Sequence, residues 1–191
     1  MSPALPLVVV KVGGGISAYP GALDSVCAAL AAAGDRHRLL LVPGGGPFAD
    51  AVRAFDERHE LSADAAHWMA ILAMDQYAHV LAERIPGARM IDAPETAAAS
   101  ANAPGVAVLA PYRWLRAADV LPHTWRATSD SVAAFVAGAL DADCLVLIKP
   151  VGRPAEALVD PCFESVLPVG LRWEVLGWDE ADRLEALLTP S

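Results

Sequence analysis

Two common features of ligand-binding proteins are absent from this sequence: closely spaced cysteines and the familiar phosphate-binding loops. The cysteines are three in number and have no C-x-x-C spacing (Cys27, Cys144 and Cys162). This pattern disfavours a metal site and predicts reduced thiols in a cytoplasmic protein. The sequence contains no G-x-x-x-x-G-K loop followed by Ser or Thr, and no G-x-G-x-x-G with an acidic residue about 20 positions further on. Any phosphate site must therefore be built differently.

Positive charge is also scarce. The chain has 14 lysines and arginines against 23 aspartates and glutamates, which gives a formal net charge of −9. This balance argues against nucleic acid or an anionic membrane as a partner, because both attract a dispersed basic surface. No apolar run reaches the roughly 18 residues that a membrane span needs, so we expect neither export nor a membrane anchor. We expect any anion to be bound locally.

What the sequence does contain is a regular alternation of strand-like and helix-like segments. At 191 residues and 55% hydrophobic content, the chain predicts one domain over residues 1–191. The alternation is typical of an α/β protein, here a three-layer αβα sandwich with a mainly parallel central sheet. The expected strands are 8–12, 38–42, 89–91, 106–110, 143–148 and 171–176. The expected helices are 18–33, 48–58, 62–84, 93–101, 128–140 and 179–188.

The expected 62–84 helix stands out because it is apolar almost all round. Ser62 is a good residue to cap it, and its apolar surface predicts burial in the domain or in a contact between subunits. We therefore expect a homodimer or a higher homo-oligomer. His67 and Asp75 on this helix each fit two roles, a structural one and acceptor binding.

Only two lysines occur, Lys11 and Lys149, and each ends an apolar run that is expected to be a strand. Lys11 leads into the glycine triplet 13–15, and the second strand leads into a second triplet within Pro43-Gly44-Gly45-Gly46-Pro47-Phe48. Glycines at a strand-to-helix turn let an anion approach backbone N–H groups. One such loop fits a tight turn equally well. Two of them at the carboxyl edge of a parallel sheet suggest transfer between two ligands.

Two further segments carry polar groups near expected helix starts. One of them, Thr128-Ser129-Asp130-Ser131, fits two roles. Its side chains could serve simply as a helix cap, or the Asp130 carboxylate could hold two nearby ammonium groups in place. The segment 121–126 combines aromatic, basic and hydroxyl side chains, which is typical of loops that line sites. Its Trp125 fits packing against the sheet equally well.

Four of these motifs, in this order, resemble the amino acid kinase superfamily, which includes aspartokinase, acetylglutamate kinase, uridylate kinase and isopentenyl phosphate kinase. The motifs are 11–15, 43–48, 128–134 and the strand that ends at Lys149, and the resemblance spans about residues 7 to 152. The short length and the sequence of the 62–84 helix look most like the small branch that contains the kinase of [5-(aminomethyl)furan-3-yl]methyl phosphate. The resemblance implies a phosphotransferase that uses ATP and Mg²⁺.

The resemblance also implies roles for matching residues near the nucleotide. Lys11 would stabilise the γ-phosphoryl group in transfer, Asp130 would orient the two lysines, and Lys149 would meet the nucleotide phosphates. Mg²⁺ would bridge those phosphates. The residues implied in nucleotide and phosphate binding are Gly13, Gly14, Gly15, Ser129 and Lys149.

On the acceptor side, the resemblance implies that the second glycine loop holds a small phosphorylated substrate. The residues implied are Gly44, Gly45, Gly46, Arg53 and His67, with Arg53 as a bidentate anchor for an anion. Where many relatives carry K-x-x-D-G-V, the sequence has Lys149-Pro150-Val151-Gly152-Arg153. Two alternatives therefore stay open: a carboxylate or nucleoside monophosphate kinase of the same fold, and a non-catalytic subunit that binds a nucleotide or an oxyanion.

Overall fold

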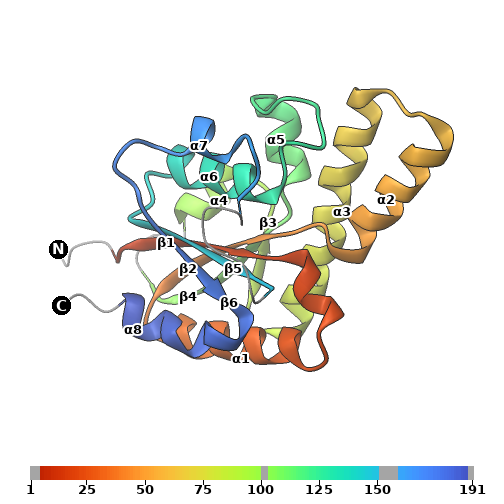
Figure 1. Ribbon diagram of the computed structural model, residues 1–191. Coiled ribbons are helices and arrows are strands. Elements are labelled where there is room, and N and C mark those ends of the chain that lie inside the picture. The colour runs from red at the N-terminus through yellow and green to blue at the C-terminus, as the bar shows by residue number, and fades with distance from the viewer. Residues whose placement is uncertain (1–4, 100–102, 151–158, 189–191) are drawn as a thin grey trace.

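A computed structural model describes residues 5–99, 103–150 and 159–188 of the chain. Its six strands form one sheet in the order β3-β4-β2-β1-β5-β6, and each pairing between these described strands is parallel. The strands are β1 (Leu7–Val12), β2 (Arg38–Pro43), β3 (Arg89–Ile91), β4 (Gly105–Leu109), β5 (Cys144–Lys149) and β6 (Arg172–Gly177). The expected α/β sandwich is confirmed (Figure 1).

Each central strand is buried on both faces, and its side chains alternate between two apolar clusters. In β1, Val8 and Val10 belong to one cluster and Leu7 and Val9 to the other. Strands β2, β4 and β5 divide their side chains in the same way. The near-continuous apolar runs of the sequence are thus those of parallel strands covered by helices on both faces.

The helices form the two outer layers. One face of the sheet is covered by α1 (Ala22–Gly34), η3 (Trp178–Arg183) and α8 (Leu184–Leu188). The other is covered by α4 (Pro94–Ala99), α5 (Tyr112–Ala118), α6 (Ser129–Ala139) and α7 (Phe163–Val166). These are the lower and upper layers in Figure 1. None of the helices among the described residues has the length and apolar content to cross a membrane.

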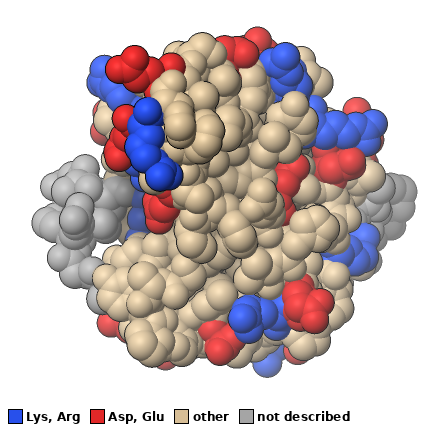
Figure 2. All heavy atoms as spheres, turned by 90° about the vertical axis from the view of Figure 1, so that its right-hand side faces the viewer, with Lys and Arg blue, Asp and Glu red and all other residues tan. Residues whose placement is uncertain are grey.

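Two further helices, α2 (Gly46–His59) and α3 (Ala63–Arg84), form a hairpin at one end of the molecule, on the right in Figure 1. Ser62 caps α3 as expected, since its hydroxyl accepts a bond of 3.2 Å from the Ala65 N–H. The first half of α3 packs in one cluster and the second half in the other. Helix α2 is the outermost and has no fully buried residue. Figure 2 faces this end and shows acidic and basic side chains interspersed around a largely uncharged centre.

Three local expectations need correction. The helix expected over 18–33 begins only at Ala22, as α1, because the chain leaves the glycine loop through a separate 3-10 turn, η1 (Gly14–Ala18), and Gly21 before the helix is left-handed. The segment 112–118, for which no helix was expected, forms α5. The last helix is not capped by Asp179. It starts as a 3-10 turn at Trp178, where Glu180 accepts the Gly177 N–H at 3.1 Å.

Candidate active site

The two lysines lie on neighbouring strands at the carboxyl edge of the sheet. Lys11 on β1 is in register with Leu147 on β5, two residues before Lys149. Both side chains are buried, although lysine is one of the most exposed residue types in proteins. A buried ammonium needs a partner, and here both lysines share one.

That partner is Asp130, the second residue of α6, whose side chain is also buried. Its Oδ1 lies 3.0 Å from Lys11 Nζ, and its Oδ2 accepts a hydrogen bond from Lys149 Nζ. Burial alone would raise the pKa of the Asp130 carboxyl, but the charges of Lys11 and Lys149 outweigh it and hold that pKa below its usual range. Burial and the charge of Lys11 lower the pKa of Lys149, and Asp130 opposes this shift. Asp130 thus holds two ammonium groups together.

A second buried carboxylate, Asp160, fixes the start of α6. Its Oδ2 accepts from the N–H and hydroxyl of Thr128 and from the Ser131 N–H, at 2.8 to 3.0 Å. Its Oδ1 accepts from the Ser131 hydroxyl and the Cys162 N–H. The Asp160 N–H in turn donates to Asp130 Oδ2 at 3.2 Å. Thr128 has the capping position but makes no side-chain cap, so Asp160 supplies the capping carboxylate from 32 residues away.

The two glycine loops touch backbone to backbone beside these lysines. A Cβ on Gly14 would lie 2.1 Å from the Gly46 nitrogen, and one on Gly44 would lie 2.4 Å from the Gly14 nitrogen. Side chains are therefore excluded at Gly14 and Gly44. A Cβ on Gly13 would lie 3.6 Å from Lys11 Nζ, so that ammonium is next to the first loop. The amides of Gly13 and Gly44 are engaged, because they donate to Ile148 O and Val12 O at 2.8 Å.

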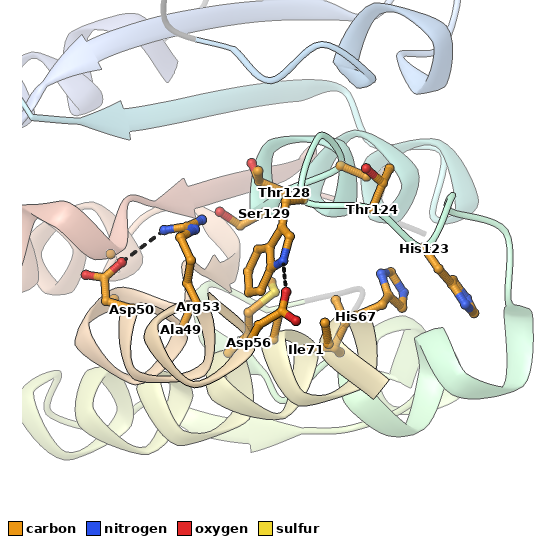
Figure 3. Close-up of a pocket in the computed structure, with 18 of the residues that line it drawn as sticks. Ala49, Asp50, Arg53, Asp56, His67, Ile71, His123, Thr124, Thr128 and Ser129 are labelled. Carbon is orange, nitrogen blue, oxygen red and sulfur yellow. Dashed lines mark hydrogen bonds and ion pairs between the residues drawn. The ribbon is translucent and has the colours of Figure 1, made fainter. Parts of the chain in front are cut away.

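A cavity of about 490 Å³ opens from the two loops between the α2–α3 hairpin and the segment 123–129 (Figure 3). Of the residues expected in the site, Gly14, Gly15, Gly45, Gly46, Arg53, His67 and Ser129 line it. Gly13 and Gly44 do not, in keeping with their engaged amides, and Lys11, Asp130 and Lys149 lie buried beside the loops and not in the cavity lining. Trp125 also lines the cavity, which decides between its two expected roles. Asp75 instead accepts the Tyr112 N–H at 3.0 Å at the start of α5, and its role is structural.

One wall of the cavity is the face of α2 that carries Asp50, Arg53 and Asp56. Arg53 pairs with Asp50 at 3.2 Å and stacks on the Trp125 ring, 4.7 Å from its centroid. The indole Nε1 donates to Asp56 Oδ2 at 2.7 Å, as the second dashed line in Figure 3 shows. The apolar face expected on α2 is only partly used: Phe48 packs near Tyr77, whereas Phe55 is 42% exposed.

Two histidines stack at the far end of the cavity. The rings of His67 and His123 are 4.2 Å apart and nearly parallel. Both nitrogens of His123 contact carboxylates, Asp64 at 3.0 Å and Asp119 at 2.9 Å. Burial, and then the charge of His123, lower the pKa of His67 from its ordinary 6.5 to about 4. His67 is therefore a neutral part of the cavity wall at neutral pH.

Comparison with known proteins gives a family: the sequence model of the amino acid kinase family matches residues 6–152. The chain belongs to the amino acid kinase family. Both glycine loops, Asp130 and the two lysines lie inside the matched segment, and Asp160 lies beyond it. The buried cluster of Lys11, Asp130 and Lys149 is thus a feature of the segment that defines this chain as an amino acid kinase family member.

One curated relative is the [5-(aminomethyl)furan-3-yl]methyl phosphate kinase of Methanocaldococcus jannaschii, which is 32% identical over 104 residues. The match covers 54% of this chain and 48% of the relative, so the chain spans about half the length of the relative that it matches. The likeness to this small branch of the amino acid kinase family agrees with the resemblance inferred from the motifs.

Solved structures of the same family share the fold. The UMP kinase of Ureaplasma parvum superposes with a TM-score of 0.70 at 12% identity, over 96% of this chain and 95% of that one. The uridylate kinase of Archaeoglobus fulgidus gives 0.57 at 18% identity, over 77% and 64%. The aspartate kinase of Synechocystis gives 0.55 at 14% identity, over 76% and 28%. At these identities the likeness shows the fold alone.

Two carboxylates of the site were not found from the sequence. Asp56 belongs to the polar face of an expected helix and has no special spacing. Asp160 lies in a turn-rich segment, far along the chain from the helix that it caps. The acidic residue of the K-x-x-D-G-V pattern is absent after Lys149, where the sequence has Pro150-Val151-Gly152-Arg153. Residues 151–158 lie outside the part that the structure describes.

Proposed function

We propose that the chain is a phosphotransferase that moves the γ-phosphoryl group of ATP, with Mg²⁺, to a small phosphate-bearing acceptor and so makes a diphosphate. The acceptor that we propose first is [5-(aminomethyl)furan-3-yl]methyl phosphate, after which the Methanocaldococcus relative is named. Membership of the amino acid kinase family supports the reaction class. The acceptor rests on a relative that the chain matches over about half its length.

The observation that carries the proposal is the buried cluster of Lys11, Asp130 and Lys149 beside two bare glycine loops. Both ammonium groups converge on the single carboxylate of Asp130, and the buried Asp160, which accepts from amide and hydroxyl donors, also acts on Lys149 through its charge. The two ammonium groups are thus held in fixed positions at the sheet edge, where phosphate oxygens can accept from them. Phosphoryl transfer needs such placed charge more than it needs covalent chemistry.

ATP would supply the phosphoryl group, and Mg²⁺ the counter-charge for its oxygens. Lys11 would contact the oxygens of the group in transfer and Lys149 those of the nucleotide, with Asp130 keeping both in place. The close contact of Gly14 with Gly46 leaves bare backbone at the cavity, which suits a phosphate cradle. The described residues include no group of three His, Cys, Asp or Glu that could hold a metal. Mg²⁺ would therefore be held mainly through the nucleotide phosphates.

The cavity wall favours an acceptor whose attacking oxygen is already ionised. With a pKa of about 4, His67 is a weak proton acceptor at neutral pH. The His123 nitrogens are engaged by Asp64 and Asp119. A hydroxyl acceptor would need a base to remove its proton, whereas a phosphate oxygen needs none.

The test is transfer from ATP, with Mg²⁺, to a panel of acceptors, scored by ADP release and by product mass. The panel holds [5-(aminomethyl)furan-3-yl]methyl phosphate, isopentenyl phosphate, UMP, aspartate and acetylglutamate. We expect a diphosphate from the first compound. The matched control is Asp130→Asn, which removes the charge that orients the lysines and should lose the activity, so that a contaminating kinase is recognised.

Three results are informative. A diphosphate formed only from the furan phosphate supports the proposal in full. An acyl phosphate from aspartate or acetylglutamate overturns the phosphate acceptor. If no panel member reacts while ATP still binds in calorimetry, the chain is a nucleotide-binding subunit without transfer activity.

A further inference from the structure

The acceptor end of the cavity contains a carboxylate, Asp56, that forms no ion pair with a cation of the described residues. Resting on the proposed function, we propose that Asp56 selects an acceptor that carries a cationic amine at the end remote from its phosphate. The acceptor class is thus a zwitterionic phosphate monoester with one flat ring. An anionic nucleoside monophosphate or a dicarboxylate does not fit this class.

Asp56 is half-buried and lines the cavity. Its Oδ1 accepts the Leu61 N–H at 3.0 Å, and its Oδ2 accepts the Trp125 indole N–H at 2.7 Å. Both donors are neutral. Within residues 5–99, 103–150 and 159–188, no Lys, Arg or His forms an ion pair with Asp56. A carboxylate offers about four acceptor positions, so about two remain for a ligand.

The contrast with Asp160 shows why this matters. Asp160 accepts five hydrogen bonds and is closed to solvent, so its capacity is used inside the protein. Asp56 accepts two and is open to the cavity. The two bonds fix the direction of its carboxylate, and the charge is left for whatever occupies the cavity. A fixed charge of this kind is preorganised for binding.

Arg53, on the same helix, is directed elsewhere. It pairs with Asp50 and lies over the Trp125 ring. In Figure 3, Arg53 lies on the side of Ser129, whereas Asp56 lies on the side of His67. The wall of α2 thus presents the Arg53–Asp50 pair nearer the glycine loops and Asp56 farther from them. A zwitterion oriented with its phosphate at the loops places its amine at Asp56.

The distance along α2 fits a small molecule with one ring. Asp56 is ten residues after Gly46, which corresponds to about 15 Å along the helix axis. A phosphate held at the loops and an amine held at Asp56 each use about 3 Å of this length for a hydrogen bond. The remainder suits a single ring with one short substituent on either side.

The surroundings of Asp56 strengthen an ion pair between its carboxylate and a cation bound in the cavity. His67 is neutral at neutral pH, and the floor from α3 is apolar (Ala66, Ala70, Ile71 and Met74). A carboxylate beside an apolar floor interacts with a cation more strongly than one surrounded by water. The Trp125 ring adds an aromatic surface against which a flat ring can stack.

The test compares two probes that differ in one atom: [5-(aminomethyl)furan-3-yl]methyl phosphate and its analogue with a hydroxyl in place of the amine. Binding of each is measured by calorimetry, and kcat/KM for transfer from ATP is measured in parallel. The selectivity is the ratio of the two values. We expect the wild-type chain to favour the amine by about tenfold to a hundredfold, the range of one charge-assisted hydrogen bond.

In Asp56→Asn we expect this ratio to fall to about one, with little change in binding of the hydroxyl probe. The matched control is Glu57→Gln, which removes the same charge from an exposed neighbouring position outside the cavity and should keep the ratio. Trp125→Phe removes the indole donor and leaves the carboxylate, so it should keep the preference for the amine. A purely structural role for Asp56 would weaken both probes equally.

The outcomes separate this inference from the proposed function. An amine preference in binding that Asp56→Asn abolishes supports the inference even if no phosphate is transferred. Transfer to both probes with equal efficiency supports the proposed function and overturns the inference. A wild-type preference that persists in Asp56→Asn also overturns it. A folded Asp56→Asn chain is recognised by an unchanged far-UV spectrum and by retained binding of ATP.

Discussion

The two parts of the site are built in different ways. At the phosphate end, beside the glycine loops, Lys11, Asp130 and Lys149 are all buried behind the cavity lining and come from two paired strands and a helix packed on them. At the acceptor end, Arg53 and Asp56 belong to α2, the outer helix of the hairpin, which has no fully buried residue (Figure 1). The first region is fixed by the core, and the second is attached to it.

This difference teaches how one fold can keep its chemistry while its acceptor changes. The lysines cannot move without disturbing β1 and β5, whose side chains fill both apolar clusters. Side chains on the cavity face of α2 can change with little effect on the core, because α2 has no buried residue. We therefore expect substitutions at the phosphate end to affect turnover or stability, and those at the acceptor end to affect mainly the choice and affinity of the acceptor.

The largest effect is expected for Lys11→Arg. Arginine keeps the positive charge, but its larger planar head does not fit the buried position between Asp130 and the first glycine loop. We expect turnover to fall by about a thousandfold, as for loss of one transition-state donor. ATP binding should stay measurable. Steady-state kinetics and calorimetry give the two values.

The control for this exchange is Arg36→Lys, an exchange of the same two residue types at an exposed position. Arg36 pairs with Glu185 on the surface, where such pairs contribute little. Its turnover should equal that of the wild type. Unchanged turnover in Lys11→Arg would show that phosphoryl transfer does not take place at Lys11.

The next largest effect is expected at Asp160, whose carboxylate fixes the start of α6, the helix that carries Asp130. In Asp160→Ala, the N–H and hydroxyl groups of Thr128 and Ser131 lose their acceptor. Because an unsatisfied buried donor costs about 1–3 kcal/mol, we expect the free energy of unfolding to fall by about 3 kcal/mol or more. We also expect kcat to fall by about tenfold, since the start of α6, which carries Asp130, loses the carboxylate that fixes it, although the residue-160 N–H still reaches Asp130. Urea denaturation and kinetics measure both.

Two variants distinguish a loss of kcat caused by a displaced Asp130 from one caused by lower stability of the chain. Asp160→Asn keeps one carbonyl acceptor and should recover part of kcat. Asp182→Asn removes an exposed carboxylate from η3 and should change neither stability nor kcat. If a folded Asp160→Ala chain keeps full kcat at a temperature well below its Tm, Asp160 has no part in holding Asp130.

The fold and the phosphate end were largely predictable from the sequence because both depend on local or periodic signals. Short apolar runs rich in β-branched residues and followed by glycines, such as 7–10, are typical of buried strands, and a lysine at the end of such a strand lies at the sheet edge. The glycine triplets mark the turns that follow. Asp130 was a candidate because polar residues cluster at the start of its helix, and its role toward the two lysines was implied by the resemblance to the amino acid kinase superfamily.

The acceptor end was less predictable because contacts between distant segments decide it. Nothing near Asp56 in the sequence indicates that Trp125 binds it from 69 residues away. Nothing near Asp160 indicates that it caps a helix that starts 32 residues earlier. Phe55, an aromatic residue within an expected helix, is 42% exposed, and α2 has no buried residue along its length. Tertiary contacts of this kind carry no periodicity.

A smaller effect is expected from the pH dependence of His67. Its pKa is about 4 in the folded chain against 6.5 ordinarily, so between these values the unfolded chain binds a proton that the folded chain does not. Stability is therefore full above about pH 6.5 and falls as the pH is lowered toward 4. We expect the wild type to lose on the order of 2 kcal/mol more than His67→Gln across this window. Urea denaturation at several pH values measures it.

His123, Asp64 and Asp119 lie around His67 and are present in both proteins, so only the difference between wild type and His67→Gln is assigned to His67. The control is His59→Gln, which removes an exposed histidine of α2 and should leave the pH dependence unchanged. Parallel pH curves for the wild type and His67→Gln would contradict the prediction.

The smallest effect is expected for Arg53→Ala, at the acceptor end. The Arg53 side chain is 46% exposed and its pair with Asp50 is screened by water, so we expect KM for a phosphate acceptor to rise by about fivefold, or about 1 kcal/mol, with kcat nearly unchanged. Arg53→Lys should not restore KM, because an ammonium does not stack flat on Trp125. Arg58→Ala on the same helix, outside the cavity, should keep the wild-type KM. If Arg53→Ala instead lowers kcat as strongly as Lys11→Arg, Arg53 contacts the group in transfer. Turnover and acceptor affinity are then not divided between the phosphate end and the acceptor end.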